Sequence, residues 1–404
     1  MLVTNEKASK SAYPDALHHI LNRESADESR AWLSHWPLIN RARTPLWELP
    51  GAASRFGIAR LCVKDESMRS PLGSFKALGA PIALMRLVTR LWHAQDIDPK
   101  RLVEGGHAPM LANLTVVSAT DGNHGRALAA AAQSIGCHCV IVLHANVSEE
   151  REQAIAAYGA RIVRIEGNYD ESVAHAARLA NENGWHVVSD TSYEGYETIP
   201  RDVMQGYATI AAEIAEADVP PFTHVFLQGG VGGLAAGIAS YFWERWGEKR
   251  PRFIVVEPRQ ADCLYQSAIA GRAAKSAGSV DSVMAGLACG EASPLAWKIL
   301  ERCIDHFMVI DDADAIDAMK TLAQGSGGDV PVVVGESGAA GFAGLAVLMR
   351  DRELARRAGL DAGARVLVIN TEGATAPAVY AQLVGESAES VSERQCGWLQ
   401  RAAG

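Results

Sequence analysis

From residue 58 onward, the chain alternates short runs of β-branched and aliphatic residues with longer alanine-rich stretches. In the first half, the runs 114–118, 139–143, 161–165 and 187–189 predict strands, and the stretches 124–135, 149–158 and 170–181 predict helices. This order is typical of βαβ units, which build a mostly parallel sheet covered by helices. It therefore restricts the chain to an α/β fold.

A second series of the same kind follows. It predicts strands at 224–227, 253–256 and 365–370 and helices at 234–246 and 339–358. The stretch 268–290 is rich in Ala, Gly and Ser and predicts a loop region. Residues 1–50 are mixed and polar, with several prolines and tryptophans. We expect them to form an irregular, partly helical segment and no domain of their own.

The composition narrows the class of protein. The 404 residues include 38 Lys and Arg and 47 Asp and Glu, a formal charge of −9, which gives no general attraction to nucleic acid or to an anionic membrane. The N-terminus lacks a signal-peptide pattern, and the apolar stretch 330–349 contains Glu336, so no membrane segment is expected. The histidines and cysteines lack zinc-ligand spacing, so no metal site is expected.

The cysteines indicate the compartment. Their odd number, seven, is too low for a disulfide scaffold, which favours a reducing cytoplasm. Cys263 and Cys289 flank the predicted loop region and could pair across it, but free thiols are the expectation in that compartment.

The first candidate site is Lys76 in the run GSFKALG (73–79), predicted to open a helix soon after a strand that ends in KDES (64–67). The helix dipole and the apolar neighbours Phe75 and Leu78 would both lower the pKa of an amine in the first helical turn. Such a lysine is suited to forming a Schiff base with an aldehyde cofactor. The alternative is an ordinary surface lysine at a helix start.

The second candidate site is the run ATDGNHG (119–125), between a predicted strand and a predicted helix. Its backbone N–H groups could bind an anion such as a substrate carboxylate, and Asn123 could hydrogen-bond a phenolic oxygen. The alternative is that Thr120, Asp121 and Asn123 only cap the helix. For His124 we expect a packed or capping role.

The third candidate site is the loop QGGVGG (228–233), between a predicted strand and a predicted helix. Gly229, Gly230, Val231, Gly232 and Gly233 would present several N–H groups at a helix N-terminus and so form a phosphate cradle. With Glu257 after the next strand, the loop also imitates a dinucleotide-binding pattern. A nicotinamide oxidoreductase would leave the lysine and asparagine loops without a purpose.

The fourth candidate is Thr371, directly after the last predicted strand. Its hydroxyl could face a pyridine nitrogen, where a carboxylate would instead keep that nitrogen protonated. The alternative is a simple cap at the end of the strand.

In this order, the four sites resemble those of the fold type II pyridoxal-phosphate enzymes, the superfamily of the tryptophan synthase β-subunit and the serine/threonine dehydratases. Within it, the chain most resembles the diaminopropionate ammonia-lyases over residues 40–380, in the runs KDES, ATDGNHGR, DTSYEGYE, MQGY, LQGGVGG, VEP, GLACGE, ESGAAG and INTEG. The resemblance implies two α/β lobes with mostly parallel sheets and pyridoxal 5'-phosphate in the cleft between them. It also implies a homodimer.

The resemblance assigns roles to the four sites. Lys76 would bind the cofactor covalently, Asn123 would contact its 3-oxygen, and Thr371 its ring nitrogen. Gly229, Gly230, Val231, Gly232 and Gly233 would hold its phosphate. A large cofactor-binding lobe would comprise residues 1–80 and 208–404, and a small mobile lobe with the asparagine loop would comprise residues 81–207.

The resemblance also implies the reaction, elimination of ammonia from 2,3-diaminopropionate to give pyruvate and ammonia. Asp121 and Asp190 are the expected catalytic carboxylates near the substrate's second amine, with Ser74 and Thr120 also at the substrate. If Lys76 and Asp121 lie on opposite faces of the substrate, both its D and L isomers would react.

Two departures from the ammonia-lyase pattern leave an alternative substrate open. The run GSFK resembles a dehydratase, and Tyr193 stands where a tryptophan is common. The alternative is therefore a dehydratase of a 3-hydroxyamino acid of the serine, threonine or phenylserine type. A cofactor-binding protein without catalysis is a further alternative, but it would not need Asp121 and Asp190.

Overall fold

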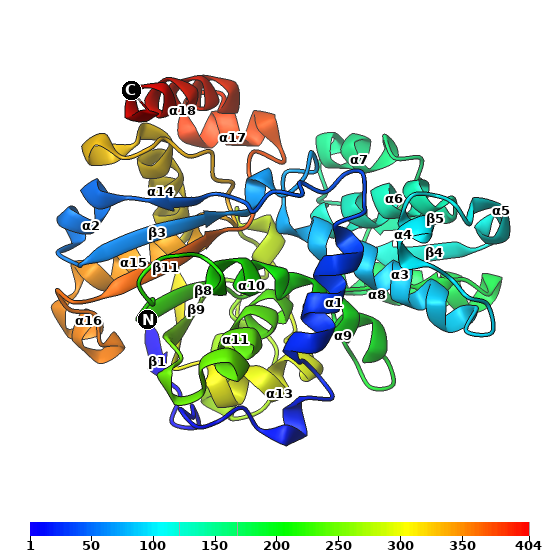
Figure 1. Cartoon of the computed structure of the whole chain (residues 1–404), viewed down its shortest axis with the longest axis horizontal. Helices are drawn as coiled ribbons and strands as arrows, with labels where there is room; N and C mark the ends of the chain where they lie inside the picture. Colours follow the sequence, from blue (N-terminus) through cyan, green and yellow to red (C-terminus); the bar gives the residue numbers. More distant parts are fainter. Residues whose placement is uncertain (121, 168, 404) are drawn as a thin grey trace.

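The computed structural model describes residues 1–120, 122–167 and 169–403, and over these residues the chain forms a seven-stranded and a four-stranded sheet. The two sheets lie side by side, with the larger on the left of Figure 1 and the smaller on the right. The larger sheet has the order β1-β10-β9-β8-β11-β3-β2. Its strands are β1 (Leu2–Thr4), β10 (His306–Ile310), β9 (Arg252–Pro258), β8 (His224–Gln228), β11 (Arg365–Asn370), β3 (Arg60–Asp65) and β2 (Leu46–Glu48).

The interior of the larger sheet is parallel, whereas both of its edges are antiparallel. Strands β10, β9, β8, β11 and β3 run in one direction, and the short strands β1 and β2 pair antiparallel with β10 and β3. Short edge strands leave little backbone exposed for pairing with another chain. The sequence predicts neither edge strand.

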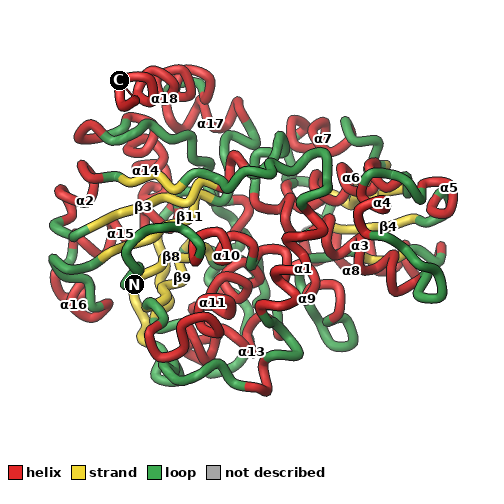
Figure 2. Tube along the Cα trace, in the orientation of Figure 1, coloured by secondary structure: helices red, strands yellow, loops and turns green. Residues whose placement is uncertain are grey.

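Helices cover both faces of the larger sheet (Figure 2). Because side chains alternate along a strand, Val225 and Leu227 of β8 face one layer, which contains α11 (Gly233–Trp246), while Phe226 faces the other, which contains α15 (Ala340–Arg350). All three side chains are fully buried. A strand buried on both faces reads as a continuous apolar run, which explains why β8 is apolar at successive positions.

The smaller sheet is parallel throughout, in the order β6-β5-β4-β7. Its strands are β6 (Arg161–Arg164), β5 (His138–Leu143), β4 (Thr115–Ala119) and β7 (His186–Val187). On one face, α8 (Tyr169–Asn183) packs against β4 and β5, and the other face belongs to the core that also includes α6 (Asn123–Ile135) and α11. A continuous apolar core therefore connects the two sheets.

Most predicted elements are confirmed to within two residues at each end, and β11 is confirmed without change. The predicted helix 339–358 is wrong, because the chain forms α15 and then α16 (Arg352–Ala358). Asp351 between them is extended, and its carboxylate accepts the N–H groups of Glu353 and Leu354. A new helix begins there because an aspartate at an N-cap stabilises it.

The chain between the predicted loop region and residue 330 is more regular than expected. It contains α13 (Pro294–Cys303), β10 and α14 (Asp312–Gln324). Near the N-terminus, α1 (Arg23–Leu33) confirms the partly helical character of residues 1–50. Within the described residues, no helix is both long and apolar enough to cross a bilayer. The boundaries of the two lobes and the mobility of the small lobe stay predictions.

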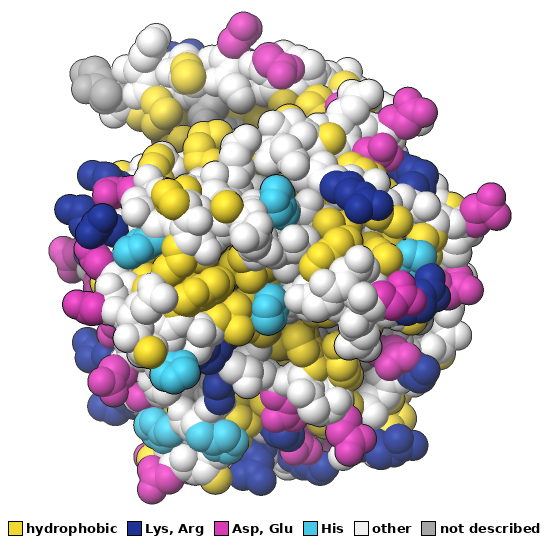
Figure 3. Space-filling model, turned by 90° about the vertical axis from the view of Figure 1, so that its right-hand side faces the viewer, with side chains coloured by type: hydrophobic (Ala, Val, Ile, Leu, Met, Phe, Trp, Pro, Cys, Tyr) yellow, Lys and Arg dark blue, Asp and Glu magenta, His cyan; other side chains and the backbone are white. Residues whose placement is uncertain are grey.

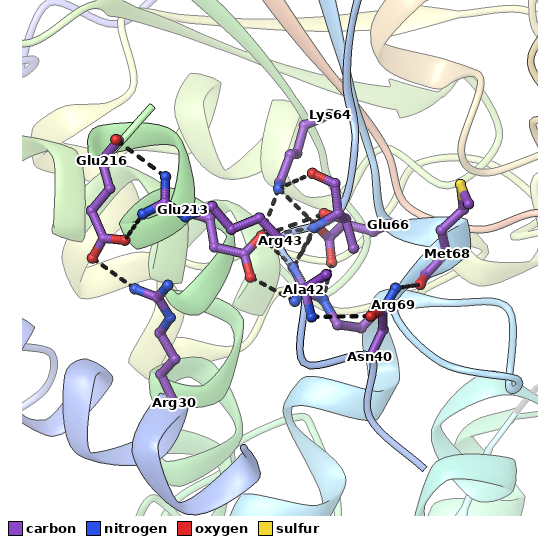
Figure 4. Close-up of polar contacts among 11 residues, drawn as sticks. Arg30, Asn40, Ala42, Arg43, Lys64, Glu66, Met68, Arg69, Glu213 and Glu216 are labelled. Carbon is purple, nitrogen blue, oxygen red and sulfur yellow. Dashed lines mark hydrogen bonds and ion pairs between the residues drawn. The ribbon is translucent and has the colours of Figure 1, made fainter. Parts of the chain in front are cut away.

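A buried ion cluster follows the KDES run. Lys64, Glu66, Arg69 and Glu213 are all at most 4% exposed. Glu213, from α10 (Thr209–Ala215), lies 2.6 Å from Nζ of Lys64 and 2.7 Å from Nη1 of Arg69, and Arg69 Nε lies 2.8 Å from Glu66. Figure 4 shows these side chains converging. The cluster ties β3 and the segment leading to Lys76 to a helix at the centre of the molecule.

Candidate active site

The four candidate sites meet at one cavity. Its wall follows the carboxyl ends of strands from both sheets: Asn123 comes after β4, Asp190 after β7, the loop 229–233 after β8 and Thr371 after β11. The carboxyl ends of parallel strands are the usual place for ligands in open α/β sheets. The side chain of Lys76 enters the same wall from a short 3₁₀ helix, Phe75–Leu78.

Lys76 makes its main polar contact with Asp190, whose Oδ2 lies 2.5 Å from Nζ. Burial acts to lower the pKa of Lys76, but Asp190, with smaller contributions from Tyr207 and Cys289, raises this pKa above its usual value. Burial likewise acts to raise the pKa of Asp190, yet the Lys76 ammonium holds that pKa below its usual range. The predicted low pKa of Lys76 is therefore wrong for this arrangement, because the sequence did not reveal the carboxylate beside the amine.

The asparagine loop is held by Thr120. Its hydroxyl oxygen accepts the N–H groups of Gly122 and Gly125 at 3.1 and 3.2 Å, so the capping interpretation fits Thr120. It does not fit Asn123, whose side-chain amide crosses to the larger sheet and donates to Glu372. Thr120 and Asn123 both line the cavity. Asp121 lies outside the described residues, and its role stays a prediction.

The glycine loop has the form of an anion cradle. Gly230 and Gly232 have φ values of +66° and +98°, which favour glycine, and the loop ends at the N-terminus of α11. A Cβ on Gly229 would lie 2.3 Å from Cγ of Glu257, so no side chain fits there. Gly229, Gly230, Val231 and Gly233 line the cavity; Gly232 packs against Leu300 instead.

Glu257 does not have the role that a dinucleotide site would give it. It is buried beneath the glycine loop and accepts the N–H groups of Leu264 and Tyr265 at the start of α12 (Cys263–Ala270). Burial raises the pKa of Glu257 to about 8. Because Glu257 already accepts two N–H groups at a helix start, it is not available to bind a ribose. The resemblance to a dinucleotide site is therefore limited to the glycine loop itself.

Thr371 and the lysine segment are joined through the backbone. The N–H of Phe75 donates to the carbonyl of Thr371 at 3.0 Å, and the N–H of Gly373 donates to the carbonyl of Gly73 at 2.9 Å. Thr371 is 2% exposed and lines the cavity. Ser74 is also buried, but this predicted substrate residue is not among the cavity-lining residues.

Several cavity residues were not predicted as site residues. Tyr207, Arg151 and Glu372 all line the cavity. The hydroxyl of Tyr207 is buried and has no hydrogen-bond partner among the described residues, and its ring lies 5.7 Å from Nζ of Lys76. Tyr207 and Glu372 lie in the runs MQGY and INTEG, which carried the family resemblance and could therefore have indicated them. Arg151 lies outside those runs.

Cys263 and Cys289, beside the predicted loop, are not joined by a disulfide. Cys263 Sγ donates to the carbonyl of Gly230 at 3.3 Å, and Cys289 lines the cavity. Tyr193 is 40% exposed, stacks on Tyr196, and is not among the cavity-lining residues. Its departure from the ammonia-lyase pattern therefore does not alter the cavity wall of this structure.

Residues 39–372 match the family model described as pyridoxal-phosphate dependent enzyme. The chain belongs to this family. Its members bind pyridoxal phosphate, and the chain has the parts for that group: a lysine in the cavity wall, a glycine cradle at a helix N-terminus and a buried threonine after β11. The fold is the expected fold type II arrangement of two mostly parallel sheets.

Within the family, the chain is similar to diaminopropionate ammonia-lyase of Escherichia coli strain K12, with 38% identity over 89% of this chain and 91% of the relative. The crystal structure of that species' enzyme with an aminoacrylate-PLP azomethine intermediate matches with a TM-score of 0.85 and 36% identity, covering 95% and 96% of the two chains. The structure of the enzyme with D-serine matches with a TM-score of 0.87 and 35% identity, covering 97% and 98%.

Proposed function

We propose that the protein is a pyridoxal-phosphate-dependent ammonia-lyase that eliminates ammonia from 2,3-diaminopropionate. The observation that carries the proposal is the 2.5 Å contact between Lys76 and Asp190 inside the cavity. A Lys76 amine that held the cofactor would no longer supply an ammonium to Asp190, and the buried carboxylate would need another cation. The second amine of diaminopropionate supplies one, whereas the hydroxyl of serine does not.

In the proposed elimination, Lys76 and Asp190 have different roles. When bound, pyridoxal phosphate would supply an electron sink for the electron pair left at the substrate's Cα. The amine of Lys76, once released, takes the Cα proton. Asp190 holds the β-ammonium, which departs as ammonia with the electrons of the Cβ–N bond. Water then converts the released 2-aminoacrylate to pyruvate and a second ammonia.

Other residues bind and orient the two molecules. Asn123 and Thr371 contact the cofactor ring, and the loop 229–233 binds its phosphate. Thr120 shapes the loop whose N–H groups receive the substrate carboxylate. Asp121 is proposed as a second base on the opposite face, which would allow both D and L isomers to react.

The test is pyruvate release by the purified holoenzyme. We expect turnover of 2,3-diaminopropionate and much slower turnover of serine, threonine and phenylserine. The run GSFK is the feature that favours the alternative, a 3-hydroxyamino-acid dehydratase. If only the hydroxyamino acids react, that alternative replaces the proposal. An absorbance band of bound cofactor that is lost in Lys76→Ala would verify the covalent link separately from the substrate.

Three broader proposals accompany the activity. We propose a large lobe of residues 1–80 and 208–404 and a small lobe of residues 81–207 that closes on the substrate. We also propose a homodimer and a cytoplasmic location. On the face shown in Figure 3, side chains of both charge signs are interspersed, which supports a small-molecule substrate over nucleic acid as the partner.

A further inference from the structure

His124 lies in the first turn of α6 and is 3% exposed. Its Nε2 lies 2.9 Å from the carbonyl oxygen of Val188. Because a carbonyl only accepts hydrogen bonds, Nε2 carries the ring proton. Burial lowers the pKa of His124, so the ring is neutral at physiological pH. The other nitrogen, Nδ1, is therefore a hydrogen-bond acceptor.

Nδ1 of His124 has no hydrogen-bond partner among the described residues, although it is buried. It lies 3.8 Å from Oδ2 of Asp190, the same oxygen that contacts Nζ of Lys76. His124, Asp190 and Lys76 all line the cavity. Two acceptors at this separation repel each other unless a group with several donors lies against both, and an ammonium has three N–H donors.

We propose that His124 is a specificity-determining residue, whose Nδ1 forms with Oδ2 of Asp190 a two-acceptor seat for an ammonium group. Of these two acceptors, Oδ2 of Asp190 contacts the ammonium of Lys76. In the holoenzyme the seat receives the β-ammonium of the substrate. A hydroxyl has a single donor, so it satisfies one acceptor and leaves the other buried and unpaired. The inference rests on the proposed function, because it explains how the site selects an amine over a hydroxyl leaving group.

Two variants separate the acceptor from the packing role of His124. In His124→Gln, the side-chain amide replaces Nε2 and keeps the hydrogen bond to Val188, but it places no acceptor at Nδ1. In His124→Asn, the amide oxygen replaces Nδ1 and the bond to Val188 is lost. His107→Gln is the matched control, because Nε2 of His107 is also buried and has no hydrogen-bond partner in the described part of the chain, but the residue does not line the cavity.

The first measurement is kcat/KM of each holoenzyme for diaminopropionate and for serine. We expect His124→Gln to reduce the preference for diaminopropionate about 10- to 100-fold, mainly through a higher KM. His124→Asn should retain more of the preference, and His107→Gln all of it. Equal losses on both substrates in the two His124 variants would overturn the proposal, because a merely structural role lowers both.

The second measurement needs neither cofactor nor substrate. The pKa of Lys76 is followed in the cofactor-free protein by ¹⁵N NMR of labelled lysine. Burial and the neighbours Asp190, Tyr207 and Cys289 act on this amine. We expect His124→Gln to lower the pKa of Lys76 and His107→Gln to leave it unchanged. An unchanged pKa in His124→Gln contradicts the seat, whereas wild-type enzyme without activity on diaminopropionate contradicts only the proposed function.

Discussion

Nζ of Lys76 and Oδ2 of Asp190 lie 2.5 Å apart, although the two residues are 114 positions apart in the chain. One residue belongs to the segment after β3 of the larger sheet, and the other follows β7 of the smaller sheet. The contact therefore spans the cavity between the two sheets. It sets the charge of both groups, because each holds the other in its ionised form.

Asp190→Asn should remove two effects of the carboxylate, its stabilisation of the Lys76 ammonium and its binding of the substrate's β-ammonium. Burial of Lys76 would then act without compensation, so the pKa of its amine should fall. Turnover of diaminopropionate should fall about 100- to 10,000-fold in kcat/KM. Steady-state kinetics measures the second effect. Glu197→Gln, which breaks an exposed ion pair with Lys298, is the control and should behave as the wild type. Near-normal activity of Asp190→Asn would remove Asp190 from the proposed mechanism.

Asp121→Asn tests the two-base hypothesis. If Lys76 and Asp121 take the Cα proton from opposite faces, the variant should lose activity on one enantiomer of diaminopropionate at least about 100-fold and keep most activity on the other. Pyruvate release from each pure enantiomer is the measurement, and the less affected enantiomer serves as the internal control. Equal losses on the two enantiomers would contradict the hypothesis.

Gly229→Ala should damage the phosphate cradle. The new Cβ would lie 2.3 Å from Cγ of Glu257, and the buried Glu257 cannot move without releasing the start of α12. We expect a loss of stability of about 1–3 kcal/mol and a weaker affinity for pyridoxal phosphate. Urea unfolding and cofactor titration measure these effects. In Gly397→Ala the nearest atom lies 3.6 Å from the new Cβ, so that control should keep both properties.

Glu336 should make the stability depend on pH. Burial, followed by repulsion from Glu372, raises the pKa of Glu336 to about 7, and both carboxylate oxygens lack hydrogen-bond partners among the described residues. The folded protein therefore holds this proton more tightly than the unfolded chain does. Stability from this group is present below about pH 4.5 and is lost as the pH rises to about 7.

Glu336→Gln removes that titration, so its melting temperature relative to the wild type should be higher at pH 8 than at pH 5. Differential scanning calorimetry at the two pH values provides the comparison. Glu393→Gln, on an exposed face of α18 (Ala388–Ala403), should show no such difference. The same offset at both pH values would mean that Glu336 does not titrate in this range.

The buried ion cluster should be intolerant of losing one member. Glu213→Gln leaves Lys64 and Arg69 with one carboxylate between them, and we expect a loss of about 3–5 kcal/mol in the free energy of unfolding. Glu216→Gln is the matched control, because Glu216 pairs with Arg30 and Arg43 at the exposed rim of the cluster (Figure 4). Its cost should be at most about 1 kcal/mol in urea unfolding.

Local patterns were sufficient for most of the fold. Most strands and helices of both sheets follow from apolar runs and alanine-rich stretches, although α13, β10 and α14 were not predicted. The residues of the glycine loop follow from its composition. The edge strands β1 and β2 could not be predicted, because three residues carry no periodic signal and each strand is stabilised by its neighbour in the sheet. The break at Asp351 was missed because the charged residues 350–353 are equally compatible with an exposed turn of one continuous helix.

The chemical identity of the candidate site was already present in the chain: a lysine, an asparagine loop, a glycine loop and a threonine, each after a predicted strand. The charges and hydrogen bonds of these residues could not be predicted from the sequence. The pKa of Lys76 depends on Asp190, the acceptor role of His124 depends on Val188, and Asn123 reaches Glu372, which is 249 positions away. Charges and hydrogen bonds act over a few ångströms in space, so these properties arise only when packing of the two sheets brings distant segments together.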